Sequence, residues 1–351
     1  MPRLARSCVR AITPTSRRIA PAWPTRFDPG SPAASAVSNT ALESTLCALG
    51  AIALWATLAS LGVALAHVPP FLLTGLALVV GSVPAWPLAR QWRVPASTLA
   101  LGVYGLFGFH FLLFVALRHA PPLEANLVNY LWPLLIVVLA PLVLPGIALR
   151  PVHVLAAAAG FAGAVLAIAG GRELAAGLTW GYVPALGSAF VWASYSLCTR
   201  RVAPFPTAAV GLFGLVSGLL ALACHLLLEP AAALSPRDMA LIGAMGLGPL
   251  GAAFFLWDRA LKTGDPRRIG ILSYLTPLAS TGLLSVVSER PLTIWIAAAA
   301  ALIVGAAVVG LTALIRRALA QARQRVPFRL RRAVSRSTGA VPRSRAHRHS
   351  A

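Results

Sequence analysis

The chain of 351 residues carries only 11% charged residues, whereas 58% of its residues are hydrophobic. A soluble domain has about 25% charged residues, so this composition cannot cover a water-exposed surface and excludes an ordinary soluble protein. The formal net charge of +21 comes mainly from the two ends of the chain, because 17 of the 30 basic residues lie in residues 1–40 and 316–351.

The arginine-rich ends, residues 1–41 and 316–351, are predicted to be disordered cytoplasmic tails. Binding to nucleic acid or to anionic lipid is the alternative. The tails lack the interleaved aromatic residues of a nucleic-acid groove, so we expect no nucleic-acid partner. Residues 1–40 also resemble a transit peptide or an over-extended gene start, and the sequence leaves open whether they belong to the mature protein.

The remaining apolar residues form runs of roughly 20, the length of a helix that crosses a bilayer. These runs are rich in Ala, Leu and Gly and do not alternate, which favours helices over barrel strands. The sequence therefore predicts an all-α integral membrane protein with ten transmembrane helices. The expected spans are residues 45–66, 69–89, 96–117, 125–144, 152–170, 180–199, 207–228, 239–261, 269–287 and 292–314.

The sequence also repeats itself. At an offset of 144, seven of nineteen positions are identical between Ala116–Leu134 and Ala260–Leu278, and an offset of 137 aligns Trp55 with Trp192. Five spans separate equivalent positions and five is odd, so the two copies should cross the membrane in opposite directions. Inverted repeats are typical of secondary transporters. The expected repeats are residues 42–171 (helices 1–5) and 178–315 (helices 6–10).

Basic residues in the short loops predict the orientation, because cytoplasmic loops carry an excess of Lys and Arg. With the N-terminus inside, the cytoplasmic loops hold eight basic residues and the outer loops hold four. We therefore expect a multi-pass protein of a bacterial inner membrane with both termini cytoplasmic. Gly214–Gly218 forms a GxxxG motif, which permits close helix packing within the bundle or, as the alternative, a homodimer.

Prolines interrupt two spans at matching positions of the repeats, and each frees the carbonyl four residues back. Freed carbonyls at equivalent places in two halves indicate a binding site at the membrane midplane. The alternative is a pair of structural kinks packed by neighbouring helices. The expected site residues here are Asn129, Tyr130 and Trp132 beside Pro133, and Ser273 and Tyr274 beside Pro277, with both prolines shaping the helices.

Aromatic residues within the spans are candidate walls of the same site. Trp55 and Trp192 lie in the middle of spans 1 and 6, although tryptophan usually prefers the membrane interface. Simple packing between helices is the alternative for both. Tyr104, Tyr195 and Trp257 are further candidates for substrate binding by the same argument.

Ionisable residues within the spans are few, and such residues suggest a functional site. His110, Glu124 and Asp258 are the candidates for charge pairing or proton coupling. For Asp258 the alternative is a local ion pair with Lys262 or Arg259, for His110 a neutral hydrogen bond between helices, and for Glu124 a solvated acid at the interface. Four cysteines form no CxxC pair, and neither a metal nor a cofactor is expected.

These residues resemble the drug/metabolite transporter superfamily, in its EamA-domain branch, over roughly residues 42–315. Leu127–Pro133 reads LVNYLWP, which resembles the signature of the bacterial aromatic amino acid exporters, and Phe190–Tyr195 and Ser273–Ser280 fit the same group. The resemblance implies a ten-helix carrier with a central cavity that exports amino acids without hydrolysing ATP. Asp258 departs from the pattern, because an uncharged polar residue is expected there in the aromatic amino acid exporters.

The expected function is therefore export of small metabolites, amino acids and aromatic ones among them, by alternating access, with no enzymatic activity. Its partners would be a small-molecule substrate and the lipid bilayer. A carrier of another cargo, such as a drug, a nucleoside or a lipid-linked sugar, is the first alternative. A membrane-embedded lipid-modifying enzyme would need clustered acids or a metal site, and nine scattered acids do not supply one. A structural or sensory protein would not need the repeat.

Overall fold

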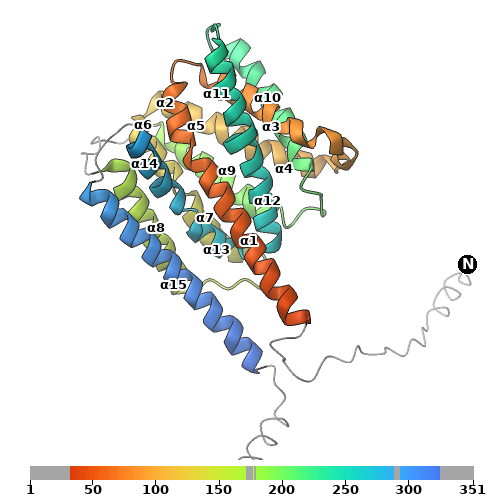
Figure 1. The fold of residues 1–351 in the computed structure, drawn as a ribbon, viewed down its shortest axis with the longest axis vertical. Coiled ribbons are helices and arrows are strands. Elements are labelled where there is room, and N and C mark those ends of the chain that lie inside the picture. The colour runs from red at the N-terminus through yellow and green to blue at the C-terminus, as the bar shows by residue number, and fades with distance from the viewer. Residues whose placement is uncertain (1–31, 171–176, 178, 288–292, 325–351) are drawn as a thin grey trace, which may run out of the picture. The chain divides into compact units, whose positions relative to one another are not determined.

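The computed structural model describes residues 32–170, 177, 179–287 and 293–324, with side chains described between residues 40 and 309. All regular elements in these ranges are helices (Figure 1). The chain divides into a unit of Val37–Pro327 and a unit of Met1–Ala36 with Phe328–Ala351. Most of the second unit, and so most of both predicted tails, lies outside the described residues. Helix nevertheless extends into each predicted tail, from Pro32 and as far as Gln324.

Most of the long helical stretches are built from two or three helices that follow one another directly. The helices are α1 (Pro32–Ala56), α2 (Leu58–Ala64), α3 (Pro70–Ser82), η1 (Val83–Trp92), α4 (Ala96–Val103), η2 (Tyr104–Gly108), α5 (Phe109–His119), α6 (Pro122–Asn129), α7 (Trp132–Val143), α8 (Pro151–Ala169), α9 (Tyr182–Cys198), α10 (Ala209–Leu228), α11 (Pro236–Leu247), η3 (Gly248–Ala252), α12 (Ala253–Thr263), α13 (Pro266–Leu272), α14 (Leu275–Val287) and α15 (Ile294–Gln324).

Eight stretches of the described chain are long and apolar enough to cross a membrane. Helix α9 has 17 residues, and the apolar part of α15, Ile294–Val309, is also shorter than these eight. The structure thus agrees with an all-helical membrane protein. The count of ten spans stays a prediction.

Two stretches break where proline removes a backbone donor. Helix α6 ends at Asn129 and α7 begins at Trp132, next to Pro133. In the same way α13 ends at Leu272 and α14 begins at Leu275, two residues before Pro277. A proline has no N–H for the carbonyl four residues back, so each helix starts afresh around its proline.

Two other stretches contain a short π-helical turn, η2 between α4 and α5 and η3 between α11 and α12. Backbone hydrogen bonds in a π-helix reach five residues along the chain, and such turns are frequent at functional sites. Close packing surrounds both turns. A Cβ added to Gly105 would meet the ring of Tyr195, and one added to Gly251 would come within 2.9 Å of the Gly81 Cα.

Glycines also bring whole helices into contact. A Cβ on Gly218 of α10 would lie 2.9 Å from the backbone oxygen of Gly75 in α3, and one on Gly214 would lie 3.5 Å from the oxygen of Leu78. The GxxxG motif of α10 therefore faces α3 of the same chain. Helix α15 packs along α8 in a similar way, because Gly163 leaves room for Ile303.

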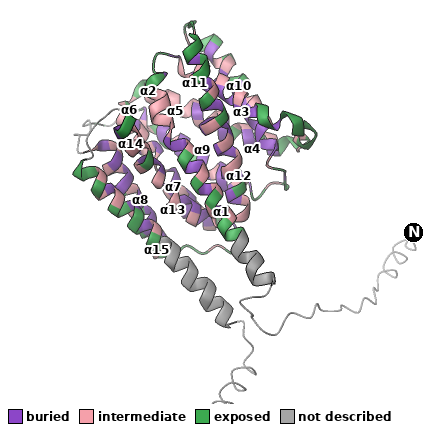
Figure 2. Ribbon diagram, in the orientation of Figure 1, coloured by how far each residue is buried: buried purple, intermediate pink, exposed green. Residues whose placement is uncertain are grey.

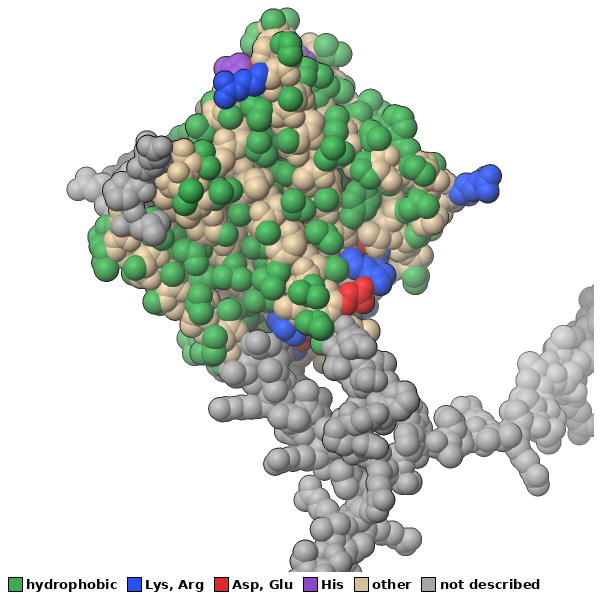
Figure 3. All heavy atoms as spheres, viewed as in Figure 1, with side chains coloured by type: hydrophobic (Ala, Val, Ile, Leu, Met, Phe, Trp, Pro, Cys, Tyr) green, Lys and Arg blue, Asp and Glu red, His purple; other side chains and the backbone are tan. Residues whose placement is uncertain are grey.

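Burial follows the pattern expected for helices in lipid. Buried residues lie where helices meet, and exposed ones lie on the outer faces (Figure 2). Large apolar side chains stay exposed there, such as Leu226, which is 80% exposed, and Leu155, which is 68% exposed. Figure 3 shows hydrophobic side chains over most of the visible face and charged ones at only a few places near its edges.

Candidate functional site

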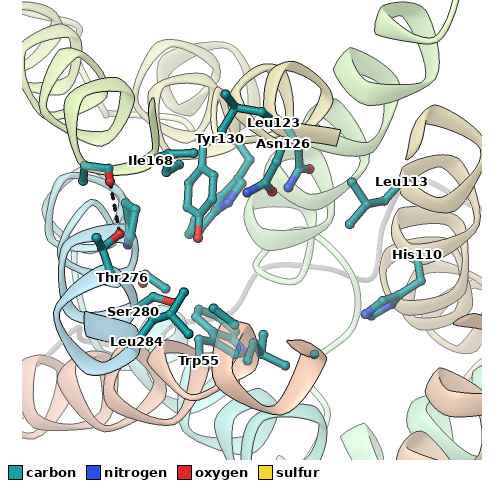
Figure 4. A pocket seen from close by; sticks show the side chains of 18 of the residues that line it. Trp55, His110, Leu113, Leu123, Asn126, Tyr130, Ile168, Thr276, Ser280 and Leu284 are labelled. Carbon is teal, nitrogen blue, oxygen red and sulfur yellow. Dashed lines mark hydrogen bonds between the residues drawn. The ribbon is translucent and has the colours of Figure 1, made fainter. Parts of the chain in front are cut away.

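A cavity with a volume of about 840 Å³ lies between the helices that carry the predicted site (Figure 4). Its lining includes Gly62, Pro70, Leu123, Gly170 and Thr293. These residues stand where α2 and α8 end and where α3, α6 and α15 begin. The cavity therefore extends to this one end of the helix bundle.

The lining is aromatic and polar but carries no formal charge, since no Asp, Glu, Lys or Arg of the described chain belongs to it. A buried charge without a partner is costly, so an uncharged lining suits a cargo without net charge. The polar side chains of the lining are Thr74, His110, Asn126, Asn129, Tyr130, Thr276, Ser280, Thr281, Ser285 and Thr293.

Four tryptophans form a cluster at the inner end of the cavity. Trp55 is central, with its ring centroid 5.2 Å from that of Trp257, 5.8 Å from Trp192 and 6.3 Å from Trp132. All four are at most 7% exposed, and three of them line the cavity, Trp257 being the exception. Centroid distances of 4.5–7 Å are typical of favourable aromatic pairs, so the cluster forms an aromatic wall.

Hydrogen bonds divide these tryptophans into two kinds. The Trp55 indole donates to the backbone oxygen of Pro249 in η3 at 3.1 Å, and the Trp257 indole donates to Oγ of Ser196 at 3.1 Å. The indole N–H groups of Trp132 and Trp192 have no partner within the described part of the chain. Since both residues line the cavity, they are donors available to a bound molecule.

The break between α6 and α7 presents polar groups to the cavity. Tyr130 is at the break itself and directs its ring into the cavity (Figure 4). Asn129 is 5% exposed, and its Oδ1 accepts a hydrogen bond from Ser188 of α9 at 2.8 Å. Asn126 lies one helical turn before Tyr130 and also lines the cavity. Asn126 was not predicted from the sequence, although its spacing from Tyr130 places both on one helix face.

Helix α14 contributes hydroxyl groups that were not predicted from the sequence. Thr276, Ser280, Thr281 and Ser285 all line the cavity. Thr276 and Ser280 are four residues apart and share one side of the helix, and Thr281 and Ser285 share the side next to it. Thr281 donates to the backbone oxygen of Ala167 at 3.2 Å. These residues could have been predicted from the sequence as two pairs of hydroxyl residues, each four apart, within an apolar span.

The structure brings some of the predicted site residues together and leaves others apart. The predicted residues on the cavity lining are Trp55, His110, Asn129, Tyr130, Trp132, Trp192 and Pro277. Those outside the lining are Tyr104, Glu124, Pro133, Tyr195, Trp257, Asp258, Ser273 and Tyr274.

Local contacts explain several of the residues outside. Ser273 turns its hydroxyl to the backbone oxygen of Ile269 at 2.7 Å. Tyr274 is fully buried and packs against Gly160 of α8. Tyr104 and Ser194 share a hydrogen bond of 2.8 Å between their hydroxyl groups. Ser273 thus bonds within its own helix, and Tyr274 and Tyr104 connect helices to one another, so none of the three belongs to the cavity lining.

Ion pairs connect the helices at the other end of the bundle. Asp258 is 2% exposed, and its Oδ2 lies 2.6 Å from Nζ of Lys262 and 2.7 Å from Oγ1 of Thr207. Arg259 pairs with Glu43 of α1 at 2.6 Å. The local pairing considered for Asp258 is thus present, and this end is closed by contacts from α1, α12 and the segment before α10.

Asp265 and Arg267 extend this closed end to the segment before α8. Arg267 pairs with Asp265 at 2.6 Å and donates to the backbone oxygen of Ala148 at 2.8 Å. Burial disfavours the ionised carboxyl of Asp265, but the hydrogen bonds and charge of Arg267 outweigh it and hold the pKa of Asp265 below its usual value of 3.8. The carboxylate is therefore charged at neutral pH.

A second charged cluster lies beside the open end. The Glu229 carboxylate, 1% exposed, pairs with Arg118 of α5 at 3.1 Å and with His225 of α10 at 3.1 Å. It also accepts backbone hydrogen bonds from Phe71 and Leu72 at 3.0–3.2 Å. Unpaired N–H groups at a helix start favour a negative partner, so Glu229 joins the start of α3 to the ends of α5 and α10.

Comparison with known proteins relates this architecture to transporters. The model of the "EamA-like transporter family" matches residues 43–169 and again 179–312. A protein from Ancylobacter novellus named "Aromatic amino acid exporter YddG" is 43% identical over 285 residues, which cover 78% of this chain and 99% of that protein. A protein of the same name from Escherichia coli is 28% identical over 72% of this chain and 92% of its own length.

A solved structure, described only as a crystal structure of protein, has the same fold. Its TM-score is 0.73 at 43% sequence identity, and the match covers 79% of this chain and 99% of the other. The part of this chain that the match leaves out is about as long as residues 1–42 and 313–351 together, which lie beyond the two family domains.

Proposed function

Since the chain belongs to the EamA-like transporter family, we propose that it exports aromatic amino acids across the bacterial inner membrane. It is a multi-pass membrane transporter rather than an enzyme. The cargo is a proposal that draws on the two relatives named as aromatic amino acid exporters. The composition of the cavity is what supports it within this chain.

The single observation that carries the proposal is an uncharged cavity of about 840 Å³ with a wall of tryptophans. Small-molecule sites typically have volumes of about 300–1,000 Å³ and combine apolar walls with a few polar groups. A zwitterionic amino acid has no net charge, and its aromatic side chain gains from offset or edge contacts with Trp55, Trp132 and Trp192. The charged Asp258 does not enter the lining, so its presence is compatible with this cargo.

We further propose that residues 42–171 and 178–315 are inverted five-helix repeats with both termini in the cytoplasm. Three observations support the repeat. The family model matches the chain twice. The π-helical turns η2 and η3 start at Tyr104 and Gly248, an offset of 144. The breaks at Tyr130 and Ser273 follow nearly the same offset. The positive charge of the loops at the closed end supports the orientation.

In this proposal the cavity faces the outside and the ion pairs close the cytoplasmic end. Export then requires that the contacts of α12 with its neighbours open to admit cargo from the cytoplasm. These are the hydrogen bonds of Asp258 with Thr207 and of Lys262 with Phe205, and the pair of Arg259 with Glu43. Asn129, Tyr130, Trp55, Trp132 and Trp192 would contact the cargo. Exchange of conformation between the two halves would move the opening from one side to the other.

Uptake of radiolabelled tryptophan into proteoliposomes tests the function, with and without an imposed pH gradient. Saturable uptake that phenylalanine and tyrosine compete away is the expected result. Competition by nucleosides or cationic drugs, with none by amino acids, would contradict the proposed cargo while leaving the carrier class in place. Absence of any saturable uptake by correctly inserted protein would contradict the proposal as a whole.

A further inference from the structure

His110 uses one ring nitrogen within its own helix. It is 9% exposed and lines the cavity, and its Nδ1 lies 2.6 Å from the backbone oxygen of Leu106. A carbonyl oxygen only accepts hydrogen bonds, so the proton of this bond belongs to Nδ1. Leu106 lies inside the π-helical turn η2, where each backbone hydrogen bond joins residues five apart. The imidazole of His110, four residues after Leu106, bonds the Leu106 oxygen with its side chain.

The other ring nitrogen is left as an acceptor. In a neutral imidazole with its proton on Nδ1, Nε2 carries a lone pair. No described residue donates a hydrogen bond to it, and Figure 4 shows the ring extending from its helix toward the cavity. No carboxylate of the described lining could balance an imidazolium, and an unbalanced buried charge is costly. The neutral acceptor form therefore fits these surroundings.

Three aromatic rings pack around the imidazole that carries this acceptor. The centroid of the His110 ring lies 5.0 Å from that of Phe109, 6.1 Å from Phe114 and 6.4 Å from Phe254. Aromatic faces attract cations, ammonium groups among them. A hydrogen-bond acceptor among three phenyl rings is thus a site for a positively charged donor, whereas a carboxylate would meet no donor there.

An amino acid carries one group of this kind. Its ammonium donates and cannot accept, and its carboxylate does the reverse. We propose that Nε2 of His110 accepts a hydrogen bond from the cargo's ammonium group, and that the rings of Phe109, Phe114 and Phe254 complete the ammonium site. This inference rests on the proposed function, and it fixes the orientation of the cargo. The free indole donors of Trp132 and Trp192 then remain for the carboxylate.

Two substitutions separate the two nitrogens of His110. In His110→Asn the amide takes the place of Nδ1 and keeps the bond to Leu106, but nothing occupies the place of Nε2. In His110→Gln the longer side chain brings an amide oxygen near the place of Nε2. The quantity to measure is competition against radiolabelled tryptophan by tryptophan and by indole-3-propionate, which lacks only the amino group.

The wild type should bind tryptophan more tightly than indole-3-propionate. The ratio of the inhibition constant of indole-3-propionate to that of tryptophan should fall about tenfold in His110→Asn, because a hydrogen bond to a charged group is lost. The ratio should be largely kept in His110→Gln. The same ratio measured with phenylalanine and 3-phenylpropionate should change in the same way, and that result would exclude the indole N–H of the cargo as the donor. An unchanged ratio in His110→Asn overturns the inference while the proposed function stands.

Two further results keep the outcomes distinct. If His110→Asn does not fold, Phe254→Leu tests the same site, and the ratio should fall about two- to fivefold. In both variants of His110, tryptophan uptake should respond to a pH gradient as it does in the wild type. Loss of the wild-type response in both variants, with an unchanged ratio of inhibition constants, would assign His110 a proton-carrying role and overturn the inference. A wild type that does not bind tryptophan refutes the proposed function itself.

Discussion

Nζ of Lys262 lies 2.6 Å from Oδ2 of Asp258, one helical turn away in α12, and 3.7 Å from the centre of the Phe205 ring. The same ammonium donates to the backbone oxygen of Phe205 at 2.9 Å. Asp258 is buried, and its Oδ1 has no hydrogen-bond partner in the described part of the chain. The pair thus joins α12 to the segment before α10 at the closed end, and one of its carboxylate oxygens is unsatisfied.

Removing one member of this pair should destabilise the protein more than removing both. Lys262→Met leaves the buried Asp258 charge with Thr207 alone, and breaking a buried pair in this way costs up to about 3–5 kcal/mol. The double variant Asp258→Leu with Lys262→Met removes the charge as well and should recover most of the loss. Thermal unfolding in detergent measures both. A double variant less stable than Lys262→Met alone would contradict this account.

Glu229→Gln should lower the melting temperature, because the carboxylate has partners on three helices. The lost charge-assisted hydrogen bonds are worth about 1–3 kcal/mol. Arg118→Gln is the matched control, since Arg118 is 44% exposed and its loss leaves the contacts of Glu229 with His225, Phe71 and Leu72 in place, so we expect the smaller loss of stability. Equal losses in the two variants would mean that the start of α3 does not depend on Glu229.

Asp265→Asn should lower stability at neutral pH and cease to matter in acid. The pKa of Asp265 is held below 3.8 in the folded protein. Ionisation of Asp265 therefore stabilises the folded protein fully above the unfolded pKa of about 3.9. This contribution is lost as the pH falls through the folded pKa. Asparagine still caps a helix, so the variant isolates the charge. Melting temperatures from pH 7 to pH 3 should converge below about pH 4. A difference that persists unchanged to pH 3 would contradict the prediction.

Gly105→Ala should destabilise the π-helical turn η2. The added Cβ would meet the ring of Tyr195, and overpacking of this kind costs about 1–3 kcal/mol. Gly62→Ala provides the control, because a Cβ there meets nothing within 4 Å and alanine favours a helix. Thermal unfolding should separate the two variants, and equal stabilities would show that η2 can accommodate the methyl group.

The helix breaks were predictable from the sequence, whereas the two π-helical turns were not. Proline acts on its own helix, so Pro133 and Pro277 indicated interruptions from local chemistry alone. The turns η2 and η3 depend on close contacts with other helices, such as Gly105 with Tyr195 and Gly251 with Gly81, which a single sequence does not display.

The site was predictable in part for a related reason. Tyr130 and Tyr274 occupy equivalent positions of the repeat, yet only Tyr130 lines the cavity. Tyr274 instead packs where Gly160 leaves space for its ring, and that space is set by α8. Glu229 was overlooked because its partners at Phe71 and Leu72 lie 157–158 residues away.

The central claim is that aromatic amino acids are carried through the cavity beside Tyr130. The most direct test is the initial rate of radiolabelled tryptophan uptake into proteoliposomes by the wild type, Tyr130→Ala and Phe190→Ala, at equal amounts of inserted protein. Phe190 is 49% exposed on the outer face of α9 and serves as the aromatic control. We expect Phe190→Ala to match the wild type and Tyr130→Ala to lose about tenfold or more of the rate, the effect of at least 1.4 kcal/mol. Wild-type uptake by Tyr130→Ala would contradict the claim.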